Sequence, residues 1–250
     1  MIATYNPYSL LEKKILVTGA SSGIGKSIAI ECSKLGAKLV ITGRNFDRLK
    51  ETMSLLTGDG HILKVLDLND TDNLQEFILD IPKLDGIVYC AGIQKTCPTK
   101  LIQRVDLDEV FETNFFSIID LNTTILSKKL LNKEASIVFI SSTAAGIVAE
   151  YGNAIYSATK GALTSFAKVL ALELIAQRIR VNCILPGMIK TPLLNKILVD
   201  EEQLKKDEER YPLGYGNPED VAYAVIYLLS NASKWITGTN LLLDGGLTLK

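Results

Sequence analysis

The chain has 250 residues, of which 47% are hydrophobic and 22% charged, and its formal net charge is −1. This is the composition of an ordinary globular protein long enough to bury a full core. Balanced charge argues against a nucleic-acid or anionic-membrane partner, and no apolar run is long enough to cross a bilayer. A single histidine and four cysteines without C-x-x-C spacing favour no metal site. With no signal-peptide pattern at the start, we expect a cytoplasmic protein.

The first predicted unit is a strand, a glycine turn and a helix. After a lead-in over residues 1–13, an apolar strand covers Lys14–Thr18 and a helix covers Gly23–Leu35. The glycines between them follow the pattern G-x-x-x-G-x-G at positions 19, 23 and 25. Such a turn lets the backbone approach a pyrophosphate, and the helix N-terminus offers N–H groups to it. A purely structural turn would explain the three glycines alone, but it explains the whole octapeptide at 18–25 poorly.

The second predicted strand, Lys38–Thr42, is followed by features that bear on the cofactor. NAD-specific folds tend to carry a carboxylate here, which bonds the ribose 2′-hydroxyl and would repel a 2′-phosphate. This chain has Gly43 and Arg44 instead, with Arg48 one helical turn later. The missing repulsion and the added guanidinium favour NADP(H) over NAD(H), the alternative being a solvated arginine at a loop tip.

A helix over residues 45–57 and a third strand over His61–Asp67 come next, and then a helix near Thr71–Asp80. Asp67 stands at the carboxyl end of its strand, where a doubly wound sheet presents groups to an adenine. It is equally suited to cap the helix that begins near Asp70. We interpret His61 as a surface or strand-edge residue.

The fourth predicted strand, Gly86–Cys90, runs directly into Ala91 and Gly92, which again allow a ligand to approach the backbone. A long helical pattern then covers Asp106–Lys133 and is interrupted near Asn114. A buried asparagine needs hydrogen-bond partners, and these could be purely structural.

The fifth strand, Ser136–Ile140, ends in three hydroxyl residues that should face the ligand crevice. The next helix runs to about Gln177 and carries Tyr156 and Lys160, which lie one turn apart on one face. An ammonium there favours the phenolate and should lower the tyrosine pKa toward working pH. In isolation, a surface lysine packed along a tyrosine ring explains the pair better.

The rest of the chain completes a repeating pattern. A sixth strand covers Arg180–Leu185, a charged helical stretch covers 192–210, a helix covers Asn217–Ser230, and a last strand covers Asn240–Leu243. Residues 192–216, which include the charged stretch, are interpreted as a substrate lid. Alternating strands and helices predict one α/β domain over 1–250, Rossmann-like, with a doubly wound parallel sheet of about seven strands and helices on both faces.

Taken in order, these motifs resemble the roughly 250-residue branch of the short-chain dehydrogenase/reductase family, from about residue 10 to the end. The matching motifs are T-G-A-S-S-G-I-G at 18–25, Asp67-Leu68, Ala91-Gly92, Asn114, Ser142, Y-S-A-T-K at 156–160, Pro186-Gly187 with Thr191, and Asp244-Gly245-Gly246.

The resemblance implies a catalytic set. Tyr156 would be the general acid or base, and Lys160 would lower its pKa and bind the nicotinamide ribose. Ser142 would polarise the substrate carbonyl, and Asn114 would hold a water that connects Lys160 to solvent. The cofactor-binding residues that it implies are Gly19, Ser21, Ser22, Gly23, Ile24, Gly25, Arg44, Asp67, Leu68, Cys90, Ala91, Gly92, Tyr156, Lys160, Pro186, Gly187, Ile189 and Thr191.

Three positions depart from the family pattern. Tyr89-Cys90 stand where Asn-Asn is usual, which removes amide side chains beside the adenosine ribose. Ser142 lies fourteen residues before Tyr156, whereas Thr143 has the common spacing of thirteen. We favour Ser142, because the strand ends in Ile-Ser-Ser as the family's does. Ser22 stands where many NADP-preferring members have a basic residue.

The resemblance implies an NADP(H)-dependent oxidoreductase that interconverts a ketone and a secondary alcohol. One subtype is a reductase of 3-oxoacyl groups on an acidic carrier protein, which a basic patch at the active-site rim would support. The candidate patch, which is equally explained as ordinary surface charge, is Lys128, Lys129, Lys133, Arg178 and Arg180. The alternative is a catalytically silent cofactor-binding scaffold; an epimerase or dehydratase is disfavoured by the glycine spacing and the short C-terminal region.

The resemblance also implies a homo-oligomer, a tetramer or dimer, formed through the helices that carry Asn114 and Tyr156. The last strand would form a second interface. The substrate should contact Gln94, Lys95, Glu150, Tyr151 and the 192–210 segment, and Lys95 and Glu150 hint at a polar substrate.

Overall fold

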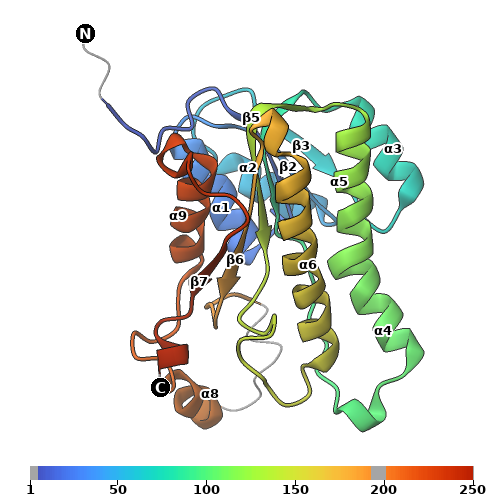
Figure 1. The fold of residues 1–250 in the computed structure, drawn as a ribbon, viewed down its shortest axis with the longest axis vertical. Coiled ribbons are helices and arrows are strands. Elements are labelled where there is room, and N and C mark those ends of the chain that lie inside the picture. The colour runs from blue at the N-terminus through green and yellow to red at the C-terminus, as the bar shows by residue number, and fades with distance from the viewer. Residues whose placement is uncertain (1–4, 193–200, 250) are drawn as a thin grey trace.

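A computed structural model describes residues 5–192 and 201–249. Its centre is a seven-stranded parallel sheet with the order β3-β2-β1-β4-β5-β6-β7 (Figure 1). The strands are β1 (Lys14–Thr18), β2 (Lys38–Gly43), β3 (Ile62–Val65), β4 (Leu84–Tyr89), β5 (Leu131–Ile140), β6 (Arg180–Pro186) and β7 (Asn240–Leu243). The helices are α1 (Gly23–Lys34), α2 (Phe46–Ser54), α3 (Thr71–Leu79), α4 (Arg104–Phe111), α5 (Ser117–Ser127), α6 (Ala154–Glu173), α8 (Glu201–Glu208) and α9 (Pro218–Leu229).

Alternate residues of the buried strands supply two cores, one on each face of the sheet. In β5, Ile137 and Phe139 join one cluster with α3, α5 and α6, whereas Val138 and Ile140 join another with α1, α2 and α9. Figure 1 shows α1 and α9 on one side of the sheet and α5 and α6 on the other. The predicted doubly wound fold is therefore confirmed.

Side chains at the helix starts fix several boundaries. Asp70 caps α3, because its Oδ1 accepts the N–H groups of Asp72 (3.2 Å) and Asn73 (3.1 Å). The helix cap suggested for Asp67 is thus made by Asp70. Asn217 and Pro218 begin α9 as predicted, with the Asn217 N–H donating to Asp220 at 2.7 Å.

The long helix predicted over Asp106–Lys133 breaks where the sequence indicated but ends earlier. A π-helical stretch, Glu112–Phe116, separates α4 from α5. The helix after it ends at Ser127, Lys129 has a left-handed φ of 55°, and β5 begins at Leu131. The prediction that this helix reaches Lys133 is wrong, because Leu131 instead pairs with Leu84 of β4.

The charged stretch predicted as a helix over 192–210 is partly outside the described residues. The part within them contains α8 and the loop through Gly216. No helix in the described ranges is both long and apolar enough to cross a membrane.

The strand order places a reversal beside β1, which has β2 on one side and β4 on the other. The connections on either side of such a reversal leave the sheet in opposite directions and open a crevice at the carboxyl ends of the strands. The glycine turn after β1 and the Ala91-Gly92 turn after β4 both lie at this end.

Candidate active site

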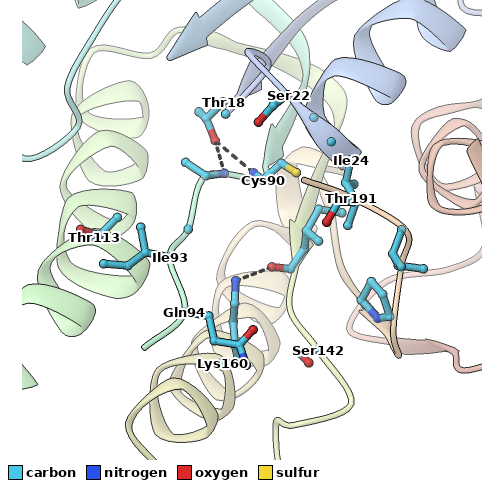
Figure 2. Close-up of a pocket in the computed structure, with 18 of the residues that line it drawn as sticks. Thr18, Ser22, Ile24, Cys90, Ile93, Gln94, Thr113, Ser142, Lys160 and Thr191 are labelled. Atoms are coloured by element: carbon cyan, nitrogen blue, oxygen red, sulfur yellow. Dashed lines mark hydrogen bonds between the residues drawn. The ribbon is translucent and has the colours of Figure 1, made fainter. Parts of the chain in front are cut away.

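A cavity of about 500 Å³ opens at the carboxyl end of the sheet (Figure 2). It is lined by the turns after β1, β2, β3, β4, β5 and β6 and by the first turns of α6. The predicted site residues that line it are Gly19, Ser21, Ser22, Gly23, Ile24, Gly25, Arg44, Asp67, Leu68, Cys90, Ala91, Gly92, Ser142, Tyr156, Lys160, Pro186, Gly187, Ile189 and Thr191. Of the predicted set, only Asn114 lies behind the wall.

The glycine turn is shaped by close backbone contacts. Gly19 has φ +68°, and a Cβ there would stand 2.9 Å from the backbone of Ala91. A Cβ on Gly25 would overlap the carbonyl oxygen of Gly19. Only glycine fits both positions, so the first turn of α1 can present its free N–H groups to the cavity.

Thr18, which the sequence analysis did not single out, joins the two turns. Its Oγ1 accepts the N–H of Cys90 at 3.0 Å and of Ala91 at 3.2 Å (Figure 2). These bonds hold the end of β4 against the end of β1 and fix the floor of the cavity between the turns. The one sequence signal for Thr18 is a hydroxyl as the last strand residue before the glycine turn.

Tyr156 and Lys160 enter the cavity from the first two turns of α6. The Lys160 Nζ lies 5.6 Å from the centroid of the Tyr156 ring and donates to the carbonyl oxygen of Ile140 at 2.9 Å. Burial lowers the pKa of Lys160 to about 8.

The ionisation of Tyr156 differs from the expectation. Burial raises its pKa to about 12, and hydrogen bonding from Ser142 only partly opposes that rise. The sequence analysis expected Lys160 to lower this pKa, and the predicted direction is wrong for the protein alone. The ammonium lies over the ring and bonds a backbone carbonyl, so desolvation of the phenolate outweighs its influence.

The two candidate hydroxyl residues, Ser142 and Thr143, have different surroundings in the structure. The Ser142 hydroxyl is near enough to Tyr156 to lower the pKa of that phenol in part, and its Oγ accepts the N–H of Ala144 at 3.1 Å. Thr143 is buried, and its N–H donates to the carbonyl oxygen of Pro186 at 2.9 Å. This arrangement places Ser142 on the Tyr156 side despite the unusual spacing.

Asn114 is fully buried in the π-helical stretch. Its Oδ1 accepts the N–H of Ile93 at 2.8 Å, and its Nδ2 donates to the Ile93 carbonyl at 2.8 Å and to Thr159 Oγ1 at 3.2 Å. The amide therefore ties the wall after Gly92 to α6, one residue before Lys160.

The opposite end of the cavity, near α2, carries Arg44 and Arg48. Both side chains are exposed, and neither has an ion-pair partner among the described residues. Asp67 also lines this end, and its side chain accepts the N–H of Asn69 at 3.1 Å.

The substrate contacts predicted from sequence divide in two. Gln94 and Glu150 line the cavity, together with Asn153 and Tyr211, which the sequence analysis missed. Lys95 is instead held by Asp106 (2.8 Å) and Glu109 (2.7 Å) on α4. Tyr151 is 88% exposed and does not line the cavity, so substrate contacts of Lys95 and Tyr151 stay a prediction that this cavity does not support.

The candidate basic patch does not lie at the rim of this cavity. Its residues belong to the end of α5, the start of β5 and the start of β6, at the amino edge of the sheet. Arg180 donates to the carbonyl oxygens of Leu228 and Ser230 and is not available to a partner. Arg178 lies beside Glu134, 3.4 Å away.

The fold and the cavity define a dinucleotide-binding oxidoreductase architecture, and comparison with known proteins agrees. A family model described as "Enoyl-(Acyl carrier protein) reductase" matches residues 19–248. The chain belongs to the short-chain dehydrogenase/reductase family, and it is an oxidoreductase of that family. Within residues 5–192 and 201–249, no three His, Cys, Asp or Glu side chains group as metal ligands.

The chain is also similar over nearly its whole length to individual members of the family. The chain is 36% identical to the 3-oxoacyl-(acyl-carrier-protein) reductase FabG of Rickettsia bellii (strain RML369-C), over 94% of this chain and 96% of that protein. It is 32% identical to a glucose 1-dehydrogenase of Gluconobacter oxydans (strain 621H), over 95% and 92%. The crystal structure of a putative betaketoacyl-ACP reductase matches with a TM-score of 0.84 at 31% identity, over 97% and 100% of the two chains.

Proposed function

We propose that the protein is an NADPH-dependent reductase of ketones whose substrates are 3-oxoacyl thioesters. The main observation that supports this proposal is that Ser142, Tyr156 and Lys160 line the same cavity as the glycine turn after β1. The relatives named as 3-oxoacyl-(acyl-carrier-protein) reductases support the substrate class.

The cavity fits a dinucleotide on its own geometry. Side chains at Gly19 and Gly25 would fill the turn that a pyrophosphate approaches, and α1 begins with free N–H groups beside it. Thr191 and the backbone of Ile189 would hold the carboxamide, and Lys160 the ribose hydroxyls. The nicotinamide, when bound, supplies the hydride.

The protein's own part is to give a proton to the carbonyl oxygen. With a pKa of about 12, Tyr156 carries its proton at neutral pH, which is the form that a general acid requires. Ser142 can donate a second hydrogen bond to the same oxygen, where negative charge develops during reduction. The alcohol is formed as the phenol proton reaches that oxygen.

Lys160 and Asn114 serve the return of the proton. With a pKa of about 8, Lys160 is mainly an ammonium at neutral pH, and its charge stabilises a phenolate left on Tyr156. Both N–H bonds of the Asn114 amide are used by Ile93 and Thr159. Neither N–H is therefore left to bind a water. A water that connects Lys160 to solvent would instead donate its hydrogen bonds to oxygen atoms of the segment around Asn114.

Cofactor preference follows from the arginine end of the cavity. Arg44 and Arg48 line it without ion-pair partners in the described residues, so a 2′-phosphate meets unpaired guanidinium groups there. We therefore assign NADP(H) as the preferred cofactor.

NADPH oxidation tests the function. The purified protein should oxidise NADPH with a 3-oxoacyl thioester, and Tyr156→Phe should reduce kcat at least about a hundredfold while leaving NADPH binding intact. Activity that survives in Tyr156→Phe contradicts this mechanism. NADPH binding without turnover of any carbonyl would favour a catalytically silent scaffold.

A further inference from the structure

Glu150 is a charged residue in the part of the cavity next to Tyr156. It lies in the connection between β5 and α6 and is half-buried. Gln94, Asn153, Tyr156 and Tyr211 line the same cavity. Its charge is close enough to help raise the pKa of Tyr156, so it stands near the reacting end of the cavity.

No donor within the described residues satisfies this carboxylate. It accepts no hydrogen bond and forms no ion pair there. The cation that acts on it electrostatically, Arg210, is bound to Asp207 at 2.6 Å. Asp207 adds negative charge at the same place, and burial together with Asp207 raises the pKa of Glu150. A partly desolvated acceptor of this kind is stabilised by a donor that a ligand brings.

Neighbouring polar groups are ordered around it. Gln94 Nε2 donates to Asn153 Oδ1 at 3.1 Å, and Asn153 is buried at the start of α6. Lys95, the basic residue next to Gln94, is held by Asp106 and Glu109 and does not neutralise Glu150. The surroundings of Glu150 in the cavity are thus polar, and no ion pair among the described residues neutralises its carboxylate.

We propose that Glu150 is a specificity-determining residue, whose carboxylate accepts a hydrogen bond from an N–H or O–H donor of the substrate near the reacting carbonyl and repels substrates that carry an anion there. This inference rests on the proposed reductase function. The donor has two possible sources, the amide N–H of the thiol arm of a thioester and the hydroxyl of a hydroxyketone.

Glu150→Gln separates charge from shape, since the amide keeps the size and one acceptor. NADPH oxidation is measured with acetoacetate (anionic), ethyl acetoacetate (neutral, no donor) and the acetoacetyl thioester of N-acetylcysteamine (neutral, with an amide N–H). Hydroxyacetone and its methyl ether form a second pair. Each kcat/KM is expressed as the ratio of variant to unaltered protein, which cancels the intrinsic reactivity of each compound.

In Glu150→Gln we expect kcat/KM to rise about tenfold for acetoacetate, because the repulsion is removed. The kcat/KM should fall about fivefold for whichever donor-bearing compound, the thioester or hydroxyacetone, hydrogen-bonds Glu150. For ethyl acetoacetate, which has no donor, kcat/KM should change less than about twofold. A fall confined to the thioester identifies the amide as the donor, and a fall confined to hydroxyacetone identifies the hydroxyl. Glu76→Gln, at an exposed position of α3, is the matched control and should change none of these ratios.

Equal ratios for all compounds in Glu150→Gln, with the unaltered protein active, would overturn this inference and leave the reductase function standing. No turnover of any compound by the unaltered protein would overturn the proposed function and the inference with it. NADPH affinity, measured by fluorescence, should be the same in both proteins, and a loss of affinity would assign Glu150 to cofactor binding instead.

Discussion

At the scale of single residues, the site is governed by what burial does to charge. Lys160 is buried and Tyr156 half-buried where they line the cavity, and burial shifts both of their pKa values toward the neutral forms. In the proposed reaction, the phenol thereby keeps the proton that reduction needs. Keeping the buried Lys160 side chain charged lowers the free energy of unfolding, and the size of this loss depends on pH.

Lys160→Met should reveal that cost. The pKa of Lys160 is about 8 in the folded protein against 10.5 for the free group, so the unfolded chain binds more protons between these values. The free energy of unfolding of the unaltered protein should therefore rise, relative to Lys160→Met, by roughly 2 kcal/mol between pH 7 and pH 10. Urea unfolding of both proteins at the two pH values measures this. Cys90 and Cys183 lie within the influence of the Lys160 charge, but burial raises the pKa of each thiol to about 12, so both stay protonated at pH 10 in either protein. A difference between the two proteins that is independent of pH would contradict the prediction.

Arg44→Ala should change cofactor preference. The loss of an exposed guanidinium opposite a 2′-phosphate should raise the KM for NADPH about tenfold and leave the KM for NADH nearly unchanged. Arg178→Ala removes an exposed arginine at the opposite edge of the sheet and is the control. Equal effects of Arg44→Ala on both cofactors would show that Arg44 does not meet the 2′-phosphate.

Some properties of these residues could be predicted from the sequence and others could not, depending on whether they arise from local structure or from contacts between distant residues. Helix geometry alone puts Tyr156 and Lys160 on one face, and a strand followed by glycines alone indicates the dinucleotide turn. The direction of the Tyr156 pKa depends on burial and on the Ile140 carbonyl that captures Lys160, and neither is local. Thr18 and Asn153 were missed for the same reason, since their partners lie 72 and 59 residues away.

At the scale of elements, the π-helical stretch between α4 and α5 connects the fold to the site. The polar interruption near Asn114 was visible in the sequence. Its consequence was not, because the bonds of Asn114 reach Ile93 after β4 and Thr159 on α6. The same limit explains why the end of α5 was misplaced: pairing of Leu131 with Leu84 ends the helix, and that contact spans 47 residues.

Asn114→Ala should loosen the cavity wall. It leaves the N–H and carbonyl of the half-buried Ile93 without their partner and should lower the free energy of unfolding by about 2 kcal/mol. Because Ile93 lines the cavity, NADPH affinity should also fall. Asn122→Ala is the matched control: Asn122 is equally buried on α5 and accepts from Tyr89 at 3.3 Å, away from the cavity. It should destabilise the protein without weakening NADPH binding, and equal losses of affinity in both variants would assign the Asn114 effect to stability alone.

At the scale of the whole molecule, the doubly wound parallel sheet was predictable from the sequence and the surface was not. Alternating strands and helices leave few arrangements, and short right-handed connections select a doubly wound sheet among them. Sequence periodicity cannot distinguish an apolar face that packs on the sheet from one that packs on another copy. On α6, Leu163 and Leu170 are buried in the core, whereas Val169 and Leu172 are exposed. Phe116, at the end of the π-helical stretch, is also exposed, and α6 packs against this stretch.

These exposed apolar side chains favour the predicted homo-oligomer, with α6 of one copy against α6 of another. Leu172 is 73% exposed, and Leu172→Glu places a charge in that face, where a partner would have to bury it unpaired. We expect light scattering to show a dimer or tetramer for the unaltered protein and roughly half that mass for Leu172→Glu. Leu79→Glu, on α3, changes a leucine that is 81% exposed and should leave the mass unchanged. Because Tyr156 is on the same helix, a monomeric Leu172→Glu variant that keeps full activity would show that assembly is not needed to position the catalytic turn. An unaltered protein that is monomeric at assay concentrations would contradict the assembly itself.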